Sequence, residues 1–323
     1  MDYLALREQL EKRGLLNKTP WYYVRNISLL IIFLTAAWTT FYTFESIYVR
    51  MAIIIALGFI CVQIGFLGHD AGHKAISNKQ AVNNIIGHIS MTLVNGVSWS
   101  YWSNRHNAHH KDPNHVDEDP DVNYLIASFN KEQAEKRNKF VRWLIKRQTF
   151  FFVPMHFLTA FSMLVNSIIH TIKESRFGEI TLLALHLSAW IVVPGIFIGF
   201  GWAALFYTIA TLLRGMYFSM VFVPNHAGMP MLNPETKLSF AEKQIITARN
   251  ITPSRFADIF FGGLNYQIEH HLFPNTSRKH LRACSEIVKE HCKQNKVRYE
   301  EVGFFKCYKD VLSHVHKISK ITN

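Results

Sequence analysis

The sequence predicts an all-α integral membrane protein with four transmembrane helices arranged in two hairpins. Two stretches without charge, Asn26–Phe44 and Met51–Gly68, each approach the roughly 20 residues that cross the hydrocarbon core of a bilayer. A third apolar region begins at Ile180 and runs to Val223, interrupted only by Arg214. That region is long enough for two more crossings. Histidine clusters stand between the apolar regions, and they indicate the chemistry.

The composition agrees with a membrane protein. Of the 323 residues 49% are hydrophobic and only 18% are charged, and we find neither repeats nor a low-complexity linker. We therefore expect a single domain over residues 1–323. The first apolar run is not a signal peptide, because no small-residue cleavage site follows it. The four cysteines, Cys61, Cys284, Cys292 and Cys307, lack zinc-site spacing, so we expect free thiols in a reducing compartment.

The basic excess of the chain lies outside the predicted spans. Lys and Arg number 35 against 23 Asp and Glu, and the excess is concentrated in residues 7–25 and 131–147. Cytoplasmic loops of membrane proteins carry such an excess. Nucleic-acid binding is excluded, because these charges are not interleaved with base-stacking aromatic residues. Anionic lipid headgroups or an acidic protein are the expected partners.

Histidines in three short motifs are the strongest functional signal. In HDAGH and HNAHH the i, i+4 spacing places two imidazoles on one helix face, with Cβ atoms about 5–6 Å apart. Imidazole binds iron, zinc, copper or nickel, and seven rings exceed the four ligands of a tetrahedral zinc. One such histidine alone is more often a core or surface residue, but three clusters together predict two metal ions. The predicted ligands are His69, His73, His106, His109, His110, His270 and His271.

These motifs can share a site only if they lie on one side of the membrane. With a cytoplasmic N-terminus, His69 follows the second crossing on the cytoplasmic side. Ala81–Tyr101 carries several polar residues, which are costly in hydrocarbon, so we expect it at the interface or dipping in and returning. Phe150–Ile169 has basic flanks and is expected on the cytoplasmic surface, while Gly199 and Gly201 would form the second hairpin turn. Both termini and the histidines are then cytoplasmic.

Two further features concern Arg214 and the N-terminal stretch. Arg214 would lie near the middle of the fourth crossing, where a charge without compensation is a functional candidate. Structural pairing inside the bundle is an equally good interpretation. The N-terminal stretch Leu4–Leu15 alternates apolar and charged residues, which is typical of an amphipathic surface helix.

The motifs HDAGH, WSNRHNAHH and QIEHHLFP, in this order, resemble the three histidine boxes of the membrane-bound fatty acid desaturase family. The resemblance covers residues 69–274 and includes NHAG at 225–228 and EDPD at 118–121. Gln267, where many members have histidine, is similar to the acyl-lipid and front-end branch. The resemblance implies a four-helix membrane domain with a cytosolic helical cap that carries two iron ions. It also implies that His226 is an eighth ligand.

The resemblance further implies an oxidoreductase, a desaturase that uses O2 as co-substrate to place a double bond in a fatty acyl lipid or an acyl-CoA. Many eukaryotic relatives carry a fused b-type cytochrome with an HPGG motif, which is absent here. We therefore expect electrons from a separate ferredoxin or cytochrome, attracted by the basic surface. Two alternatives stay open, a related membrane hydroxylase and a membrane metal transporter or sensor. Transporters, however, usually hold their ligands near the bilayer midplane.

Polar residues next to the ligands are expected to orient the imidazoles by accepting the second ring N–H. Ordinary solvation is the alternative, and it is strongest for Asp119. The candidates are Asp70, Glu269, Asp119, Asp121 and Gln267.

Overall fold

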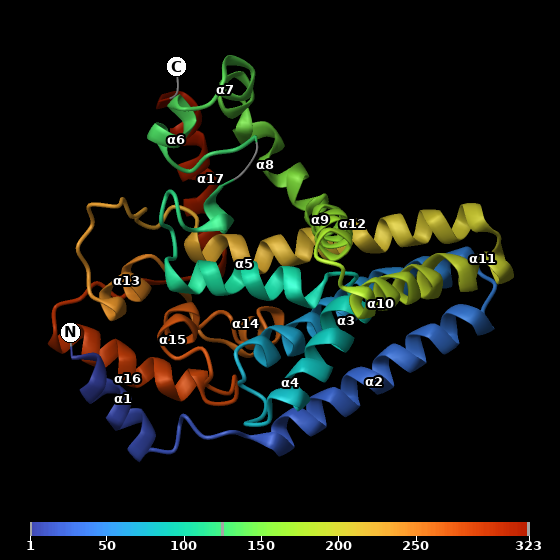
Figure 1. The fold of residues 1–323 in the computed structure, drawn as a ribbon, viewed down its shortest axis with the longest axis horizontal. Coiled ribbons are helices and arrows are strands. Elements are labelled where there is room, and N and C mark those ends of the chain that lie inside the picture. The colour runs from blue at the N-terminus through green and yellow to red at the C-terminus, as the bar shows by residue number, and fades with distance from the viewer. Residues whose placement is uncertain (1, 124–125, 322–323) are drawn as a thin grey trace. The chain divides into compact units, whose positions relative to one another are not determined.

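The structure is a computed structural model that describes residues 2–123 and 126–321 (Figure 1). It is mostly helical, which confirms the predicted all-α class, and it adds one short parallel strand pair, β1 (Asn250–Ile251) and β2 (Glu301–Val302). The chain divides into two compact units. Unit 1 comprises residues 1–17, 104–155 and 220–323, and unit 2 comprises residues 18–103 and 156–219. The single-domain description stays a prediction.

Unit 2 consists of apolar helices joined by short turns. Three helices continue from one unit into the other, namely α5 (Trp99–Lys111), α8 (Gln148–Phe157) and α12 (Phe200–His226). The helices and π-helical segments that lie wholly in unit 2 are α2 (Pro20–Thr43), α3 (Ile47–Gly72), α4 (Gln80–Gly87), η1 (His88–Val94), α9 (Thr159–Lys173), α10 (Phe177–Leu187), η3 (Ser188–Val192) and α11 (Val193–Ile198).

Four helical segments are long and apolar enough to cross a membrane: α2, α3, Phe177–Ile198 and α12. They coincide with the four predicted crossings. The pair α8 and α9 passes the same test when taken together, but it bends by 64° between the two helices. The described residues therefore hold four candidate crossings, or five if the bent pair forms one. The surface placement of Phe150–Ile169 stays a prediction.

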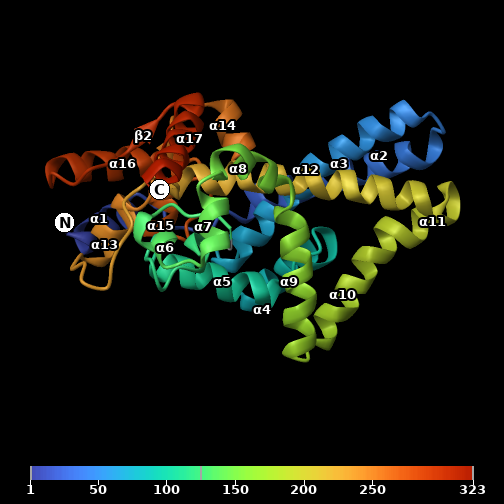
Figure 2. The ribbon, with the colours of Figure 1, turned by 90° about the horizontal axis from the view of Figure 1, so that it is seen from above.

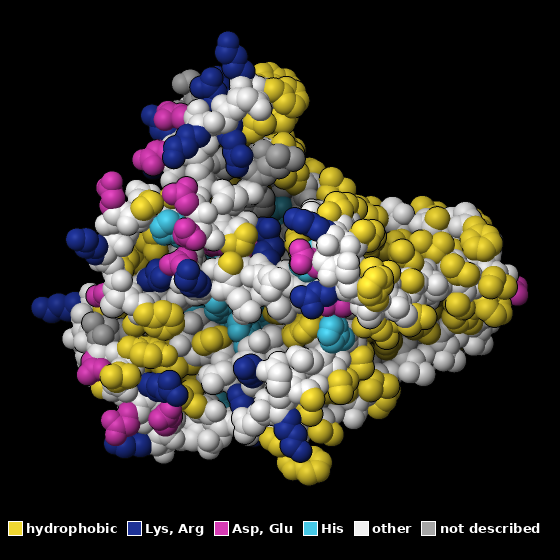
Figure 3. Space-filling model, viewed as in Figure 1, with side chains coloured by type: hydrophobic (Ala, Val, Ile, Leu, Met, Phe, Trp, Pro, Cys, Tyr) yellow, Lys and Arg dark blue, Asp and Glu magenta, His cyan; other side chains and the backbone are white. Residues whose placement is uncertain are grey.

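The core of unit 2 is made by its apolar helices packing on one another. Phe41 of α2, Leu57 of α3, Trp190 of η3 and Phe206 of α12 all belong to one buried cluster. Many outward side chains are also apolar, and Figure 3 shows hydrophobic side chains gathered over α10 and α11. Phe197, for example, is 70% exposed, which suits contact with lipid rather than with water.

Three details of the predicted crossings were wrong. The first helix begins at Pro20 rather than Asn26. Proline is favoured in the first turn of a helix, and the residues between Pro20 and Asn26, although Arg25 is charged, continue the helix. The second continues to Gly72, so His69 lies inside α3. The turn before α12 uses Gly199 alone, whose φ of 88° favours glycine, whereas Gly201 lies inside the helix.

A buried polar cluster lies among the apolar helices of unit 2. Arg214 is 1% exposed and lies in α12, as predicted for the fourth crossing. Its Nη2 donates to Thr211 Oγ1 at 2.7 Å, and the Trp190 ring centroid is 5.1 Å from its Cζ. His186 pairs with the Leu93 carbonyl of η1 through Nδ1 and with the Tyr207 hydroxyl through Nε2. The Arg214 charge is thus held by a hydroxyl group and an aromatic face.

Gly215 should not tolerate a side chain. A Cβ atom there would lie 2.6 Å from the Phe157 carbonyl oxygen and 2.9 Å from the His156 carbonyl oxygen, and backbone atoms cannot rotate away. We expect Gly215→Ala to lower the free energy of unfolding by about 1–3 kcal/mol, the usual effect of overpacking. Thermal unfolding in detergent measures it. Gly201→Ala, in the same helix with nothing within 4 Å, is the matched control, and equal melting of the two variants would contradict the packing argument.

Unit 1 is built from shorter helices around a separate core. The elements that lie wholly in unit 1, besides β1 and β2, are α1 (Tyr3–Lys12), η2 (Pro120–Val122), α6 (Lys131–Glu135), α7 (Lys139–Ile145), α13 (Phe240–Ile246), α14 (Arg255–Phe260), α15 (Gln267–Leu272), α16 (Leu281–Gln294) and α17 (Phe304–Ile321). Asn250 pairs with Glu301, and Ile251 with Val302, in the parallel strand pair.

The N-terminal helix α1 belongs to the core of unit 1. Leu6 and Leu10 are fully buried against Ile268 of α15 and Val288 of α16, and Figure 2 shows α1 beside α16. The expected surface helix over Leu4–Leu15 was therefore only half right. The alternating pattern identified an amphipathic helix correctly, but its apolar face packs on protein.

Candidate metal centre

Helix α5 carries the second histidine motif, and its N-terminus is fixed by a buried acid. The carboxylate of Glu179 accepts hydrogen bonds from the Ser98 hydroxyl and from the Ser100 backbone N–H. A carboxylate at this position satisfies backbone donors that lack partners within the helix, and it complements the helix dipole. Sequence reasoning missed Glu179. Its only signal was an acid at the border of a long apolar run.

Three of the predicted ligands form a first group in unit 1. The ligand nitrogens of His106, His110 and His270 lie within 4.8 Å of one another. The Nε2 atoms of His106 and His110 are 3.2 Å apart, as expected for an i, i+4 pair on one helix. The ring centroids of His110 and His270 are 4.7 Å apart. Residues more than 150 positions apart in the chain thus present their nitrogens to one small volume.

A second group in unit 1 contains His109, His226 and His271, again with ligand nitrogens within 4.8 Å. The Nε2 atoms of His226 and His271 are 3.1 Å apart. His109 and His271 are 5% and 1% exposed, so the group is shielded from bulk water. This group includes the histidine of the NHAG motif, which ligand spacing alone would not have identified.

In each ring of the second group Nδ1 has a fixed partner, and we call Nδ1 the outer nitrogen. His109 Nδ1 lies 2.8 Å from Asp119 Oδ2, His226 Nδ1 lies 3.0 Å from the Thr247 carbonyl, and His271 Nδ1 lies 2.9 Å from Gln244 Oε1. The carbonyl of Thr247 and Oε1 of Gln244 can only accept, so both Nδ1 atoms carry the proton. Neutral rings then leave the two facing Nε2 atoms as lone-pair donors. Such a donor set fits a metal ion of the iron or zinc kind.

Gln267 lies beside the second group. Its Nε2 is 3.0 Å from His226 Nε2, and its Oε1 accepts from Asn225 Nδ2 at 3.0 Å. Asn225 also donates to the Val221 and Leu264 carbonyls, which fixes its amide orientation and therefore that of Gln267. The amide N–H of Gln267 thus points at the nitrogen that a metal would use, and ligation by His226 requires this amide to move aside.

Asp119 is the best-connected acid of the site. It is fully buried, and it accepts from the backbone N–H of Asn114 and of Asp121 besides His109. Burial alone would raise the pKa of Asp119 and lower that of His109. Their mutual hydrogen bond and attraction outweigh burial, so the pKa of Asp119 is lowered and that of His109 is raised. The alternative of ordinary solvation is therefore wrong for Asp119.

The neighbouring Asp121 has a looser position. Its Oδ1 accepts from Arg105 Nε at 2.8 Å, and its Oδ2 is 3.9 Å from His109 Nδ1.

Asn114, a residue that sequence reasoning missed, connects this loop to the rest of unit 1. Its side-chain amide lies 3.2 Å from the His226 carbonyl and 3.3 Å from the Thr247 carbonyl.

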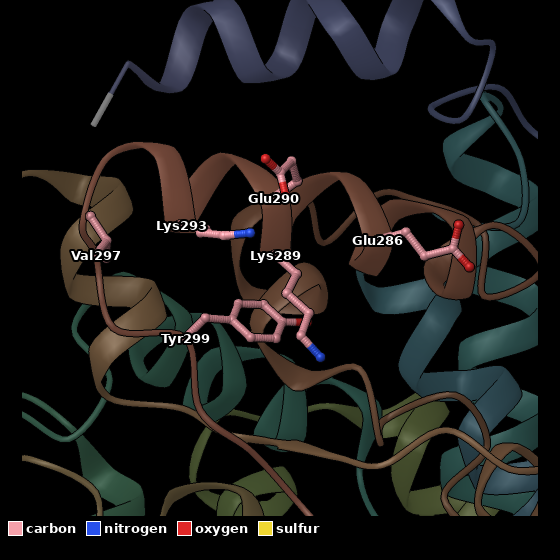
Figure 4. Close-up of a pocket in the computed structure, with 6 residues that line it drawn as sticks. All are labelled: Glu286, Lys289, Glu290, Lys293, Val297 and Tyr299. Carbon is pink, nitrogen blue, oxygen red and sulfur yellow. The ribbon is translucent and has the colours of Figure 1, made fainter.

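Glu269 is buried between Asn250 and Tyr299. Its Oε2 accepts from Asn250 Nδ2 at 2.7 Å, and its Oε1 accepts from Tyr299 Oη at 3.0 Å. Burial raises its pKa to about 7, although both hydrogen bonds oppose this. Its hydrogen-bond partners are thus an amide and a phenol. Tyr299 also lines an open groove with Lys289, Lys293 and other residues of α16 (Figure 4).

The first histidine motif lies in unit 2. His69 and His73 sit at the end of α3 with ring centroids 4.9 Å apart, as the i, i+4 spacing predicts. Asp70 lies 3.5 Å from His69 Nδ1, at the limit of a hydrogen bond, and it accepts a stronger bond from the Tyr23 hydroxyl at 2.9 Å. The expected role of Asp70 in orienting its neighbour is therefore weak.

Gln244 is an orienting residue that sequence reasoning missed. Its Oε1 accepts from His271 Nδ1, and its Nε2 donates to the His110 carbonyl at 2.9 Å, so one amide joins both groups of unit 1. Since outer partners of this kind typically contribute 10–100-fold to metal affinity, we expect Gln244→Ala to lower affinity about tenfold. Metal analysis of the purified protein after dialysis measures the loss. The exposed Gln294→Ala is the control, and full metal retention by Gln244→Ala would contradict the role.

Comparison with known proteins identifies a family and several relatives. The profile of the family described as fatty acid desaturase matches residues 45–303. The chain is 29% identical to the Delta(6)-fatty-acid desaturase fat-3 of Caenorhabditis elegans, over 95% of this chain and 72% of that protein. It is 31% identical to the acyl-lipid (9-3)-desaturase of Physcomitrium patens, over 94% of this chain and 59% of that protein.

A third relative is the Delta(5) fatty acid desaturase fat-4 of Caenorhabditis elegans, 28% identical over 94% of this chain and 70% of that protein. The family profile covers most of the chain, including all eight histidines described above. The chain belongs to the fatty acid desaturase family.

Proposed function

We propose that this protein is an oxygen-dependent acyl desaturase that holds two iron ions with eight histidines. The ligands would be His69, His73, His106, His109, His110, His226, His270 and His271. The overall reaction takes two hydrogen atoms from a fatty acyl chain, and two electrons and two protons from outside, and reduces dioxygen to two water molecules. The acyl chain would be carried by a lipid or by coenzyme A.

One observation carries the proposal. Six buried or half-buried imidazoles of unit 1 form two groups, and the outer nitrogens of the second group are each held by an acceptor. This arrangement supports tightly held metal rather than metal in transit, because the rings cannot swing away without breaking those bonds. It favours an enzyme over the alternative of a metal transporter or sensor.

The chain's own residues prepare the centre. When bound, the iron pair supplies the oxidising power to remove hydrogen from an unactivated C–H bond, which no side-chain acid or base can do. Asp119, Gln244 and the Thr247 carbonyl hold the rings so that Nε2 faces inward. The burial of His109 and His271 excludes water, which limits side reactions.

The remaining parts of the proposal concern partners and placement. Electrons would come from a protein carrier, a ferredoxin or a b-type cytochrome with its reductase, guided by the basic surface of the chain. Both termini and the histidines would face the cytoplasm, as the basic residues 7–25 and 131–147 favour. The third motif, QIEHH, supports an acyl-lipid or front-end activity.

Expression in a host without polyunsaturated fatty acids tests the proposal. With a competent electron donor present, mass spectrometry of total fatty acids should reveal a new double bond, and its position would identify the regiochemistry. A hydroxylated fatty acid would favour the hydroxylase alternative. An unchanged profile from protein that contains about two irons per chain would refute desaturation.

A further inference from the structure

Unit 1 exposes an apolar patch on α14 and at the start of α17. Phe256 and Ile259 of α14 are 60% and 62% exposed, and Phe305 at the start of α17 is 84% exposed. Phe304 connects them, because its ring centroid lies 5.5 Å from that of Phe256 and 5.2 Å from that of Phe305. Phe256, Ile259 and Phe305 are called the α14–α17 patch below. Contiguous exposed apolar surface of this kind marks an interaction site.

The packing of α17 leaves Phe305 outside the protein core. The inner face of this helix buries Cys307, Val311 and Val315, and the last two pack on Phe129 and Phe152 of unit 1. Phe305 lies on another face of the helix. Its exposure therefore follows from the helix register.

The patch lies next to the end of α12, a helix that is long and apolar enough to cross a membrane. The Tyr308 hydroxyl donates to the Met220 carbonyl at 2.6 Å, and Cys307 Sγ donates to the Pro224 carbonyl at 3.3 Å. Met220 and Pro224 lie in the last two turns of α12, which is apolar enough to span a bilayer and ends at His226. Phe305 is within one helical turn of Tyr308, so it lies near the last two turns of α12.

Basic residues border the same patch. Arg255 precedes Phe256, and Lys306 and Lys309 follow Phe305, all three exposed; Lys306 also pairs with Asp310 at 2.6 Å. Bulky apolar side chains bordered by cations are typical of surfaces that rest in the headgroup region of a membrane. We propose that the α14–α17 patch inserts into the lipid surface around the end of α12 and anchors unit 1 to the bilayer. This anchoring is independent of the metal and of the reaction.

Site-directed fluorescence in full-length protein tests the anchoring. All four native cysteines are buried, so cysteines introduced as Phe305→Cys and Ile259→Cys can be labelled selectively with an environment-sensitive dye. The control is Lys293→Cys on the charged groove of α16 (Figure 4). Each labelled protein is placed in nanodiscs of phosphatidylcholine and phosphatidylserine, with or without lipids that carry a quencher just below the headgroups.

We expect quenching and a blue-shifted emission at positions 259 and 305 and neither at position 293. Replacing phosphatidylserine by phosphatidylcholine should weaken the quenching, since the bordering cations would lose their counterparts. Absence of lipid quenching at both patch positions overturns the proposal, whether the dye reports water or a protein partner. Equal quenching at position 293 also overturns it, because contact with lipid would then not distinguish the patch.

Discussion

Replacing His271 by alanine is expected to abolish double-bond formation. The change removes a nitrogen that faces His226 Nε2 at 3.1 Å, and it leaves Oε1 of Gln244 without the N–H that it accepts from. A ligand removed from a preorganised centre cannot be replaced by a neighbouring side chain, because the remaining rings are fixed through their outer nitrogens. Product analysis in the expression host and metal analysis of the purified variant measure the effect. We expect desaturated product below detection and reduced iron content.

The control for this variant is His115→Ala. His115 lies close to the second motif in sequence, but its Nδ1 accepts from the backbone N–H groups of Asp117 and Glu118 in a surface loop. It should retain iron and activity. Both variants are first checked for monodisperse behaviour in detergent, so that unfolding is not mistaken for loss of a ligand. Wild-type iron and product in His271→Ala would contradict the assignment.

Asp119→Asn should be the most damaging change outside the eight proposed histidine ligands. The asparagine keeps the shape but loses the charge that holds the His109 Nδ1 proton, and it offers one acceptor oxygen where two are used. Outer partners of ligating histidines typically contribute 10–100-fold, and we expect a loss of about 100-fold in metal affinity. Breaking a buried charge pair also lowers the stability of the folded protein, by about 3–5 kcal/mol.

Metal titration and thermal unfolding of the metal-free protein separate these two effects of Asp119→Asn. Asp117→Asn, an exposed neighbour in the same loop, is the matched control and should change neither quantity. If Asp119→Asn lowered stability but kept full metal affinity, Asp119 would be a structural residue of the loop and not an orienting partner of His109.

The sequence was sufficient for features that depend on local pattern. Charge-free length located all four candidate spans, and the i, i+4 spacing predicted that His106 and His110 would face one another. The NHAG motif supplied His226 through family resemblance alone. The spans and the His106–His110 contact could be predicted because bilayer thickness and helix geometry leave few alternatives, whereas ligation by His226 stays a prediction.

Features that depend on tertiary contact could not be predicted in the same way. Gln244 is 27 residues from His271 in the chain, and the sequence around a helical glutamine contains no pattern that predicts such a partner. Glu179 is 79 positions from the Ser100 backbone N–H that it satisfies. For α1, the periodicity gave an apolar face but not the surface that covers it, which is the core of unit 1.

The buried guanidinium of Arg214 has a consequence for biogenesis. A helix with arginine at its centre enters a bilayer at a penalty of about 2.5–3.5 kcal/mol on insertion scales. The indole of Trp190, which faces Arg214, arrives earlier from η3, and the hydroxyl of Thr211 arrives one turn ahead on the same helix. Nascent α12 should therefore leave the translocon together with the preceding helical segment, as a pair rather than singly.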